Sequence, residues 1–179
     1  MQPVTELGLI KETLKYSNLF QGLSNDELDK VLPLCQEKEY EAGVVIFAEG
    51  ALCRTMYIVQ SGKVAVEVTV RIGRGAEGSA TIDVITQGGC LCCAGLLDPN
   101  ILDVTGQTLE PTKVITLNAA ELKRLLEDNP KMGRRVMSNL AGVVSSRLQS
   151  TRQTAARILS VVFHDLKAPL AAVENYNRL

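Results

Sequence analysis

Residues 43–64, GVVIFAEGALCRTMYIVQSGKV, decide the fold of this chain. Short apolar runs stand between turn-forming residues that include Gly43, Gly50 and Gly62. Glycine is favoured in tight corners because it adopts a positive φ without a steric penalty. This spacing predicts short β-strands that are joined by tight turns.

The same pattern continues on both sides of this stretch. Further β-prone runs lie at 37–41, 64–71, 80–86, 102–109 and 113–117. The segment 64–86 is expected to form a hairpin with its tip at 73–79. Many short strands with Gly and Pro between them predict an antiparallel β-sandwich or barrel.

Helical patterns flank the β-prone region. A short helix is predicted at 5–16, and the capping box Ser24–Glu27 opens a second one whose apolar side extends to Cys35. After the last β-prone run the apolar period becomes helical, with one helix at 119–128 and a long one at 131–168. The chain is therefore mainly β with helices at both ends.

Composition favours an ordinary soluble domain with an appendage. The 179 residues are 46% apolar and 22% charged, with a net charge of −1. No apolar run approaches the roughly 18 residues of a membrane span, and no secretion signal is visible. Five cysteines without such a signal favour a reducing setting over a disulfide scaffold. We therefore expect a cytoplasmic protein with no membrane partner.

The charge is unevenly distributed along the chain. Residues 1–118 carry 9 basic and 15 acidic side chains, net −6, whereas residues 119–179 carry 10 and 5, net +5. This asymmetry suggests two modules. Because the basic residues are spread out and no helix-turn-helix pattern with a glycine turn is present, we expect no nucleic-acid partner.

The predicted helix at 131–168 is too long to serve its own domain alone. At about 1.5 Å per residue it measures about 57 Å, which exceeds the width of a domain of this size. It fits a heptad pattern of small and apolar residues. The a positions are Ala141, Leu148, Ala155 and Val162, and the d positions are Met137, Val144, Thr151 and Ile158. We expect a homodimer through this helix; the alternative is a helix packed on its own barrel.

Residues 18–150 resemble the cyclic-nucleotide-binding domains of the catabolite-activator-like superfamily. The resemblance rests on Leu19-Phe20, on Leu23-Ser24, on the 43–64 stretch and on the order of the elements. It implies a double-stranded β-helix, or jelly roll, with flanking helices and a long C-terminal coiled-coil helix. The expected domains are an N-terminal helix at 1–17, the roll with its flanking helices at 18–130 and the dimerisation helix at 131–179.

Such domains hold their ligand in a short cassette, which corresponds here to residues 88–100. The resemblance implies a Gly-Glu pair whose Glu binds the ribose hydroxyl, then backbone amides that face the phosphate, then an arginine. Here the Glu position falls on Gly89 or Cys90, and the arginine position near Ile101 or Leu102. The candidate ligand-binding residues are Gly88, Gly89, Cys90, Leu91, Cys92, Cys93 and Ala94.

The cassette therefore lacks the charges that hold a cyclic phosphate, since no arginine occurs between Arg74 and Arg124. Losing one partner of a buried charge pair costs about 2–5 kcal/mol, which lowers affinity by roughly thirty- to several-thousandfold. We expect a degenerate cassette with no certain cofactor, for which a cyclic nucleotide is a disfavoured ligand. The alternative is a genuine cyclic AMP or cyclic GMP receptor that replaces the arginine with backbone amides.

Cys90, Cys92 and Cys93 open a further alternative. Closely spaced thiols suit a redox sensor or a soft-metal site, whereas cysteine also serves as a small apolar residue in a tight turn. A closed zinc site needs four ligands, so Cys35 or Cys53 would have to reach the cassette through the fold. We favour the small apolar role and predict no metal site.

Residues 162–170, VFHDLKAPL, resemble the H-box of sensor histidine kinases. The resemblance implies that His164 is the phosphoacceptor and that Asp165 is the base that orients its ring and accepts its proton. The heptad pattern places His164 at position c, on the outer face. The implied partners are a histidine kinase catalytic domain and a response regulator.

This H-box stands where the DNA-reading domain of a transcription regulator would begin, which disfavours that class. The chain ends before the ATP-binding domain of a kinase, so we expect no enzyme activity from the chain itself. The sequence therefore predicts the sensory half of a two-component kinase.

Overall fold

The structure is a computed structural model. It describes residues 6–72, 76–97 and 100–176, and for residues 72, 76 and 162–176 it describes the backbone alone. The chain forms two compact units, Met1–Val144 and Ser145–Leu179.

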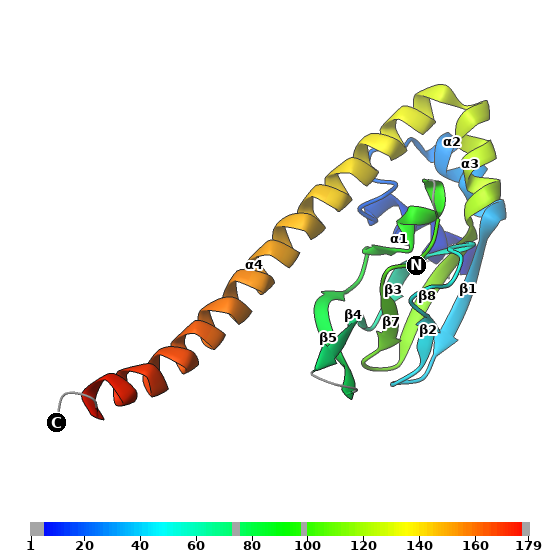
Figure 1. Cartoon of the computed structure of the whole chain (residues 1–179). Helices are drawn as coiled ribbons and strands as arrows, with labels where there is room; N and C mark the ends of the chain where they lie inside the picture. Colours follow the sequence, from blue (N-terminus) through cyan, green and yellow to red (C-terminus); the bar gives the residue numbers. More distant parts are fainter. Residues whose placement is uncertain (1–5, 73–75, 98–99, 177–179) are drawn as a thin grey trace. The chain divides into compact units, whose positions relative to one another are not determined.

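The β region lies between helices at both ends of the chain (Figure 1). The helical elements are α1 (Glu6–Tyr16), α2 (Asn25–Val31), the 3-10 helices η1 (Leu32–Leu34) and η2 (Cys93–Leu96), α3 (Ala119–Asp128) and α4 (Pro130–Tyr176). The strands are β1 (Cys35–Tyr40), β2 (Val45–Phe47), β3 (Thr55–Ser61), β4 (Val64–Ile72), β5 (Ala76–Ile85), β6 (Cys90–Leu91), β7 (Thr105–Thr108) and β8 (Thr112–Asn118).

Helix α2 begins with the predicted capping box. The side-chain oxygen of Ser24 accepts a hydrogen bond from the Glu27 amide, and the Glu27 carboxylate accepts one from the Ser24 amide. The predicted extension of this helix to Cys35 is wrong, because Cys35 is the first residue of β1. Pro33 lies in the intervening 3-10 turn, where its missing amide donor cannot continue α-helical hydrogen bonding.

Within the described residues the strands form two four-stranded antiparallel sheets. One has the order β1-β8-β3-β6 and the other the order β2-β7-β4-β5. Figure 1 labels all of these strands except β6. Neighbours in a sheet are often distant in sequence, since β1 pairs with β8 along its whole length. This is the jelly roll with flanking helices that the sequence predicts.

The predicted hairpin at 64–86 is present, but its strands run further than predicted. Gly78 and Ser79, expected in the tip, lie within β5, where Gly78 pairs with Val70 of β4. The ladder satisfies their backbone groups, which overrides the weak strand propensity of these residues. The part of the predicted tip at 73–75 lies outside the described residues.

Buried side chains form clusters on both faces of β3. Met56 and Ile58 belong to a cluster that includes Leu14 of α1 and Leu122 of α3. Val59 belongs to the cluster between the two sheets. Because successive side chains on a strand point to opposite faces, β3 joins the helical layer to the interior of the roll.

Helix α4 begins as part of the first compact unit. Its side chains Met132, Val136, Leu140 and Val143 are buried and lie on one helical face. The predicted heptad seam runs along a different face, where Met137 and Val144 are exposed. The first turns of α4 therefore pack on their own domain and leave the predicted seam uncovered.

The same helix continues to Tyr176, beyond the predicted end at 168, and includes Pro169. Among the helices of the described residues, none combines the length and apolar character that a membrane span requires.

Candidate functional site

The cassette begins with a tight turn between β5 and β6. Gly88 has a φ of +79°, and a Cβ at this position would lie 3.2 Å from the carbonyl oxygen of Tyr16. The Gly88 amide donates to the Val59 carbonyl oxygen at 2.8 Å, and the Val59 amide donates to the Gly89 carbonyl oxygen at 3.0 Å. The turn at Gly88 and Gly89 therefore packs tightly against β3 and the C-terminal end of α1.

Two short elements follow this turn, and the sequence pattern predicted neither. Strand β6 pairs with Tyr57 and Ile58 of β3, and η2 starts at Cys93. Segments of two and four residues are too short to show a periodicity. The candidate residues from Gly88 to Ala94 are nevertheless contiguous in space, running from the turn through β6 into η2.

Three of the candidate amides already donate inside the protein. The Gly88 amide bonds to β3, and the Gly89 amide donates to the carbonyl oxygen of Thr86 at 2.9 Å. The Cys90 amide donates to the side-chain oxygen of Asn18 at 3.1 Å. An amide engaged in an internal hydrogen bond is not available to an anion. The anion-facing amides predicted from the sequence are thereby reduced to those that follow Cys90.

The loop after α1 joins the cassette to α4. In addition to its side-chain contact with Cys90, Asn18 donates a hydrogen bond from its backbone amide to the carbonyl oxygen of Gly88 at 2.9 Å. Asn139 of α4 donates its side-chain amide to the carbonyl oxygens of Leu19 and Gln21, each at 2.9 Å. These contacts form one continuous path within the first compact unit. Sequence reasoning missed both asparagines, because no local pattern marks pairs so far apart in the chain.

The backbone at the start of η2 adopts a left-handed conformation at Cys92. Its φ is 57°, and within the described residues it is the one non-glycine residue with a positive φ. A side chain in this left-handed region costs about 1–2 kcal/mol. Its thiol is buried, and such a conformation persists where the surroundings hold it in place.

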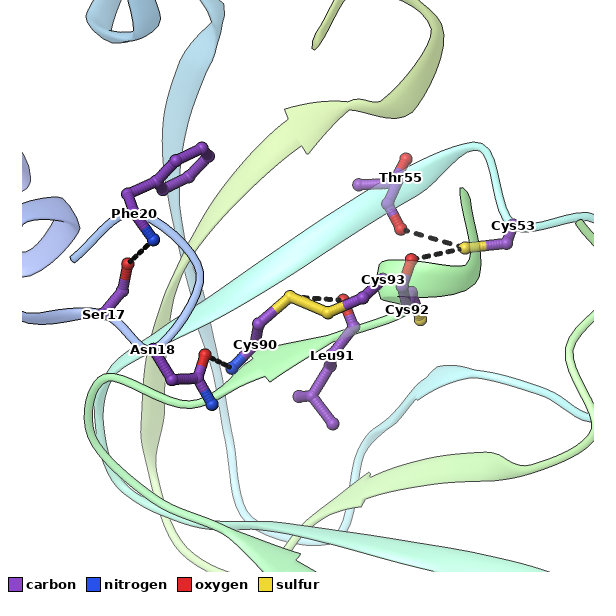
Figure 2. Close-up of a disulfide and its surroundings, with 9 residues drawn as sticks. All are labelled: Ser17, Asn18, Phe20, Cys53, Thr55, Cys90, Leu91, Cys92 and Cys93. Carbon is purple, nitrogen blue, oxygen red and sulfur yellow. Dashed lines mark hydrogen bonds between the residues drawn. A yellow bond between two sulfur atoms is a disulfide. The ribbon is translucent and has the colours of Figure 1, made fainter. Parts of the chain in front are cut away.

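Four cysteines gather around β6 and η2, as Figure 2 shows. Cys90 and Cys93 are joined by a disulfide, with their Cα atoms 6.5 Å apart. The Cys53 thiol donates to the carbonyl oxygen of Cys92 at 2.8 Å. All four side chains are buried. Burial agrees with a small apolar role in the turn, but the disulfide and the approach of Cys53 add a cluster of sulfur atoms.

The thiols of Cys53 and Cys35 lie in different environments. A hydrogen bond with the Cys92 side chain lowers the pKa of the Cys53 thiol, while burial raises it and the Gly95 amide lowers it. Cys35 lies apart on β1, where burial raises the pKa of its thiol to about 12. Within the residues that the structure describes, no group of three or more His, Cys, Asp or Glu is placed to hold a metal ion.

The positions expected to carry the arginine have apolar side chains. Leu102 is 5% exposed and packs between the sheets in the cluster that contains Leu91 and Cys92. Ile101 is exposed and forms an isolated β-bridge with Leu52. Leu102 thus packs among hydrocarbon and sulfur.

His164 and Asp165 lie on α4, but their side chains lie outside the described residues. The described side chains of the second unit include large apolar residues that are more than half exposed. These are Leu148, Ile158, Leu159 and Val161. The helix therefore carries uncovered apolar side chains on the N-terminal side of residues 162–170.

Comparison with known families identifies the fold. The family model "Cyclic nucleotide-binding domain" matches residues 37–129, which is more than half of the chain. The chain belongs to the cyclic nucleotide-binding domain family.

Known members of this family resemble the chain at modest identity. The cyclic AMP receptor protein of Thermus thermophilus is 29% identical over 136 residues, which cover 76% of this chain and 59% of that protein. The CRP-like cAMP-activated global transcriptional regulator of Mycobacterium tuberculosis is 22% identical over 162 residues, covering 89% and 66%. The crystal structure of a cyclic nucleotide-binding domain from Methylobacillus flagellatus superposes with a TM-score of 0.68 at 23% identity, covering 86% and 83%.

The chain is thus a cyclic nucleotide-binding-like regulatory domain that spans 59% and 66% of the length of the two curated relatives. The cassette's chemistry is a sulfur cluster beside apolar residues.

Proposed function

We propose that this chain is the sensory module of a bacterial two-component histidine kinase. In this proposal a degenerate cyclic-nucleotide cassette passes its state through a dimeric helix to the phosphoacceptor His164. The observation that carries the degenerate cassette is the apolar core around Leu102, at the position expected to hold the phosphate-binding arginine.

The cassette lacks a positive charge for the phosphate, and we therefore expect it to bind cyclic nucleotides weakly. A phosphate monoanion gains about 4 kcal/mol from a cation at 4 Å when the effective dielectric constant is near 20. No arginine of the sequence lies between Arg74 and Arg124, and Leu102 and Ile101 supply hydrocarbon in its place. The Cys90 amide, already bonded to Asn18, cannot compensate.

Calorimetric titration with cyclic AMP and cyclic GMP tests this part of the proposal. We expect no saturable heat with the chain at micromolar concentration. The cyclic AMP receptor protein of Thermus thermophilus, titrated with cyclic AMP, is the positive control. Micromolar binding to this chain would contradict the degenerate cassette.

The second candidate function is a genuine cyclic AMP or cyclic GMP receptor. It is favoured by the names of the relatives, two of which are a cyclic AMP receptor and a cAMP-activated regulator. In that case amides that follow Cys90 at the start of η2 would hold the phosphate. The titration separates the two candidates.

The route from the cassette to the helix is supported by the contacts of Asn18 and Asn139. Asn18 bonds both Gly88 and Cys90, and Asn139 of α4 bonds the loop that carries Asn18. A change at the cassette would therefore alter the support of α4. Signal would pass as a change between two arrangements of packed helices.

The dimer would form along the exposed apolar face of α4. Leu148 and Ile158, at predicted a and d positions, are uncovered in the single chain. Two copies that pack these side chains together would remove them from water. Light scattering should therefore give twice the chain mass of 19.4 kDa.

The role of His164 rests on the H-box resemblance and on its place in a continuous helix. The coding sequence downstream of Leu179 provides the sharpest test. We expect the second helix of a dimerisation hairpin, an ATP-binding domain and a cognate response regulator. A helix-turn-helix DNA-binding domain at that place would contradict the proposal and favour a transcription regulator.

A further inference from the structure

Two pairs of cysteines meet in the cassette. Cys90 of β6 is joined to Cys93, the first residue of η2, by the disulfide. Cys92 lies between them in the left-handed conformation, and its carbonyl oxygen accepts from the Cys53 thiol. This arrangement couples a covalent bond to the backbone conformation at the place where the family binds its ligand.

We propose that Cys90 and Cys93 form a reversible thiol–disulfide switch that sets the conformation of the turn between β6 and η2. The oxidant is a low-molecular-weight disulfide of the glutathione class, written RSSR. The link from this switch to His164 rests on the proposed function, whereas the switch itself does not.

Oxidation proceeds by two thiol–disulfide exchanges. The Cys93 thiolate attacks one sulfur of RSSR; a mixed disulfide forms, the RS–SR bond breaks and RS⁻ leaves. The Cys90 thiolate then attacks the Cys93 sulfur, so the Cys90–Cys93 bond forms and the second RS⁻ leaves. The two cysteine protons end on the two released thiolates as two RSH. The protein loses two electrons and RSSR gains two.

The disulfide ties two differently supported segments together. Cys90 is held by pairing with β3 and by the hydrogen bond from its amide to Asn18. Cys93 begins η2, whose next anchors are the 3.1 Å bond from the Gly95 amide to the Cys92 carbonyl oxygen and contacts with α3. Reduction removes the covalent link that spans Cys92, so its unfavourable φ loses one of its restraints.

The burial of the sulfur atoms sets the kinetics of the switch. Cys90 is 0% exposed and Cys93 is 5% exposed. A soluble disulfide therefore reaches them when the segment opens locally. Exchange should be slower than in the unfolded chain and should accelerate in mild denaturant.

Cys35 provides a matched control. It is a half-buried thiol on β1, and its sulfur donates to the carbonyl oxygen of Val31 at 3.5 Å. It takes no part in the cassette cluster. The variant Cys35→Ser removes one thiol and should leave the switch unchanged.

The test is equilibration of the full chain in glutathione buffers of graded oxidised-to-reduced ratio, without oxygen. Acid quenching, unfolding, alkylation and tandem mass spectrometry then assign each cysteine. We expect Cys90 and Cys93 to be protected together as the buffer becomes oxidising, while Cys35, Cys53 and Cys92 stay alkylated. Cys90→Ser and Cys93→Ser should each abolish this protection, and Cys35→Ser should retain it.

Three results would overturn the switch. These are a Cys90–Cys93 pair that stays reduced in every buffer, one that stays oxidised in every buffer, and a disulfide that joins other cysteines.

Hydrogen exchange of the wild-type chain is the second measurement, in case a serine variant fails to fold. We expect severalfold faster exchange at amides 91–97 after reduction and no change in α3; equal exchange in both states also overturns the proposal. A switch that passes both tests while the titration shows micromolar nucleotide binding would refute the degenerate cassette alone.

Discussion

Asn18 and Cys90 are 72 residues apart in the chain, yet the side-chain oxygen of Asn18 accepts the Cys90 amide at 3.1 Å. The same asparagine donates its own amide to Gly88. The side chain of a loop residue therefore accepts the hydrogen bond of the first amide of β6, within the predicted cassette. This bond stabilises the cassette and removes a donor from it at the same time.

Replacing Asn18 with alanine should destabilise the roll. The variant Asn18→Ala leaves the buried amide of Cys90 without its acceptor, which costs about 1–3 kcal/mol. Urea denaturation should show this loss in the free energy of unfolding, and the Cys90 amide should exchange faster with solvent.

Gln21→Ala is the matched control for this variant. Gln21 is exposed in the same loop, and its side chain makes one long contact of 3.5 Å with the Asn18 carbonyl oxygen. Its removal should change stability by less than about 0.5 kcal/mol. Equal losses in the two variants would show that the Asn18 side chain has no special role.

Asn139→Ala tests the other end of the path. The side-chain amide of Asn139 bonds two carbonyl oxygens of the α1–α2 loop, and the net value of each bond is about 0.5–1.5 kcal/mol. We expect a loss of about 1–3 kcal/mol in urea denaturation and faster hydrogen exchange in residues 17–23. Ser138→Ala, on the exposed neighbouring position, should leave both quantities unchanged.

The sequence predicted what local rules control. The capping box of Ser24 and Glu27, the helix Ala119–Asp128 and most strand positions are encoded in a few neighbouring residues. Glycine at tight corners and alternation along β3 are equally local. These patterns predict an antiparallel sandwich or barrel, and the resemblance to cyclic-nucleotide-binding domains implied the jelly roll.

The sequence predicted which residues form the candidate site, but it did not predict their contacts. The candidate residues at 88–94 lie together in the roll, but their hydrogen-bond partners come from Asn18 and the sulfur contact from Cys53. Pairs 72 and 39 residues apart leave no periodic signal. The disulfide between Cys90 and Cys93 likewise depends on how β6 and η2 present their sulfur atoms, whereas the expected reducing setting argued against any disulfide.

Cys35 should be nearly inert at neutral pH in the folded chain. Burial raises the pKa of its thiol from 9.0 to about 12, so the thiolate fraction falls by about a thousandfold, since each pKa unit is a factor of ten. Iodoacetamide at pH 8 should therefore modify Cys35 far more slowly in the native than in the unfolded chain. A native rate within a few-fold of the unfolded rate would contradict this.

The raised pKa of Cys35 also predicts how the stability of the chain changes with pH. The folded-state pKa of Cys35 lies above its unfolded value, so above pH 9.0 the unfolded chain loses this proton first. The contribution of Cys35 is therefore complete below that pH and is lost progressively as the pH rises toward about 12. Cys35→Ser should flatten this part of the pH profile, measured by urea denaturation between these two values.

Leu148→Lys should dissociate the proposed dimer without unfolding the roll. Leu148 is 51% exposed in the single chain, so a lysine there makes little difference to the monomer. In a two-chain seam the same change removes about 1.5–3 kcal/mol of apolar burial per copy and places two ammonium groups side by side. Light scattering over a concentration series should therefore shift from twice 19.4 kDa to 19.4 kDa. Ser146→Lys, at the outer heptad position f, adds the same charge outside the seam and should keep the dimer. If both variants keep the wild-type mass, the seam at Leu148 is not the interface of the dimer.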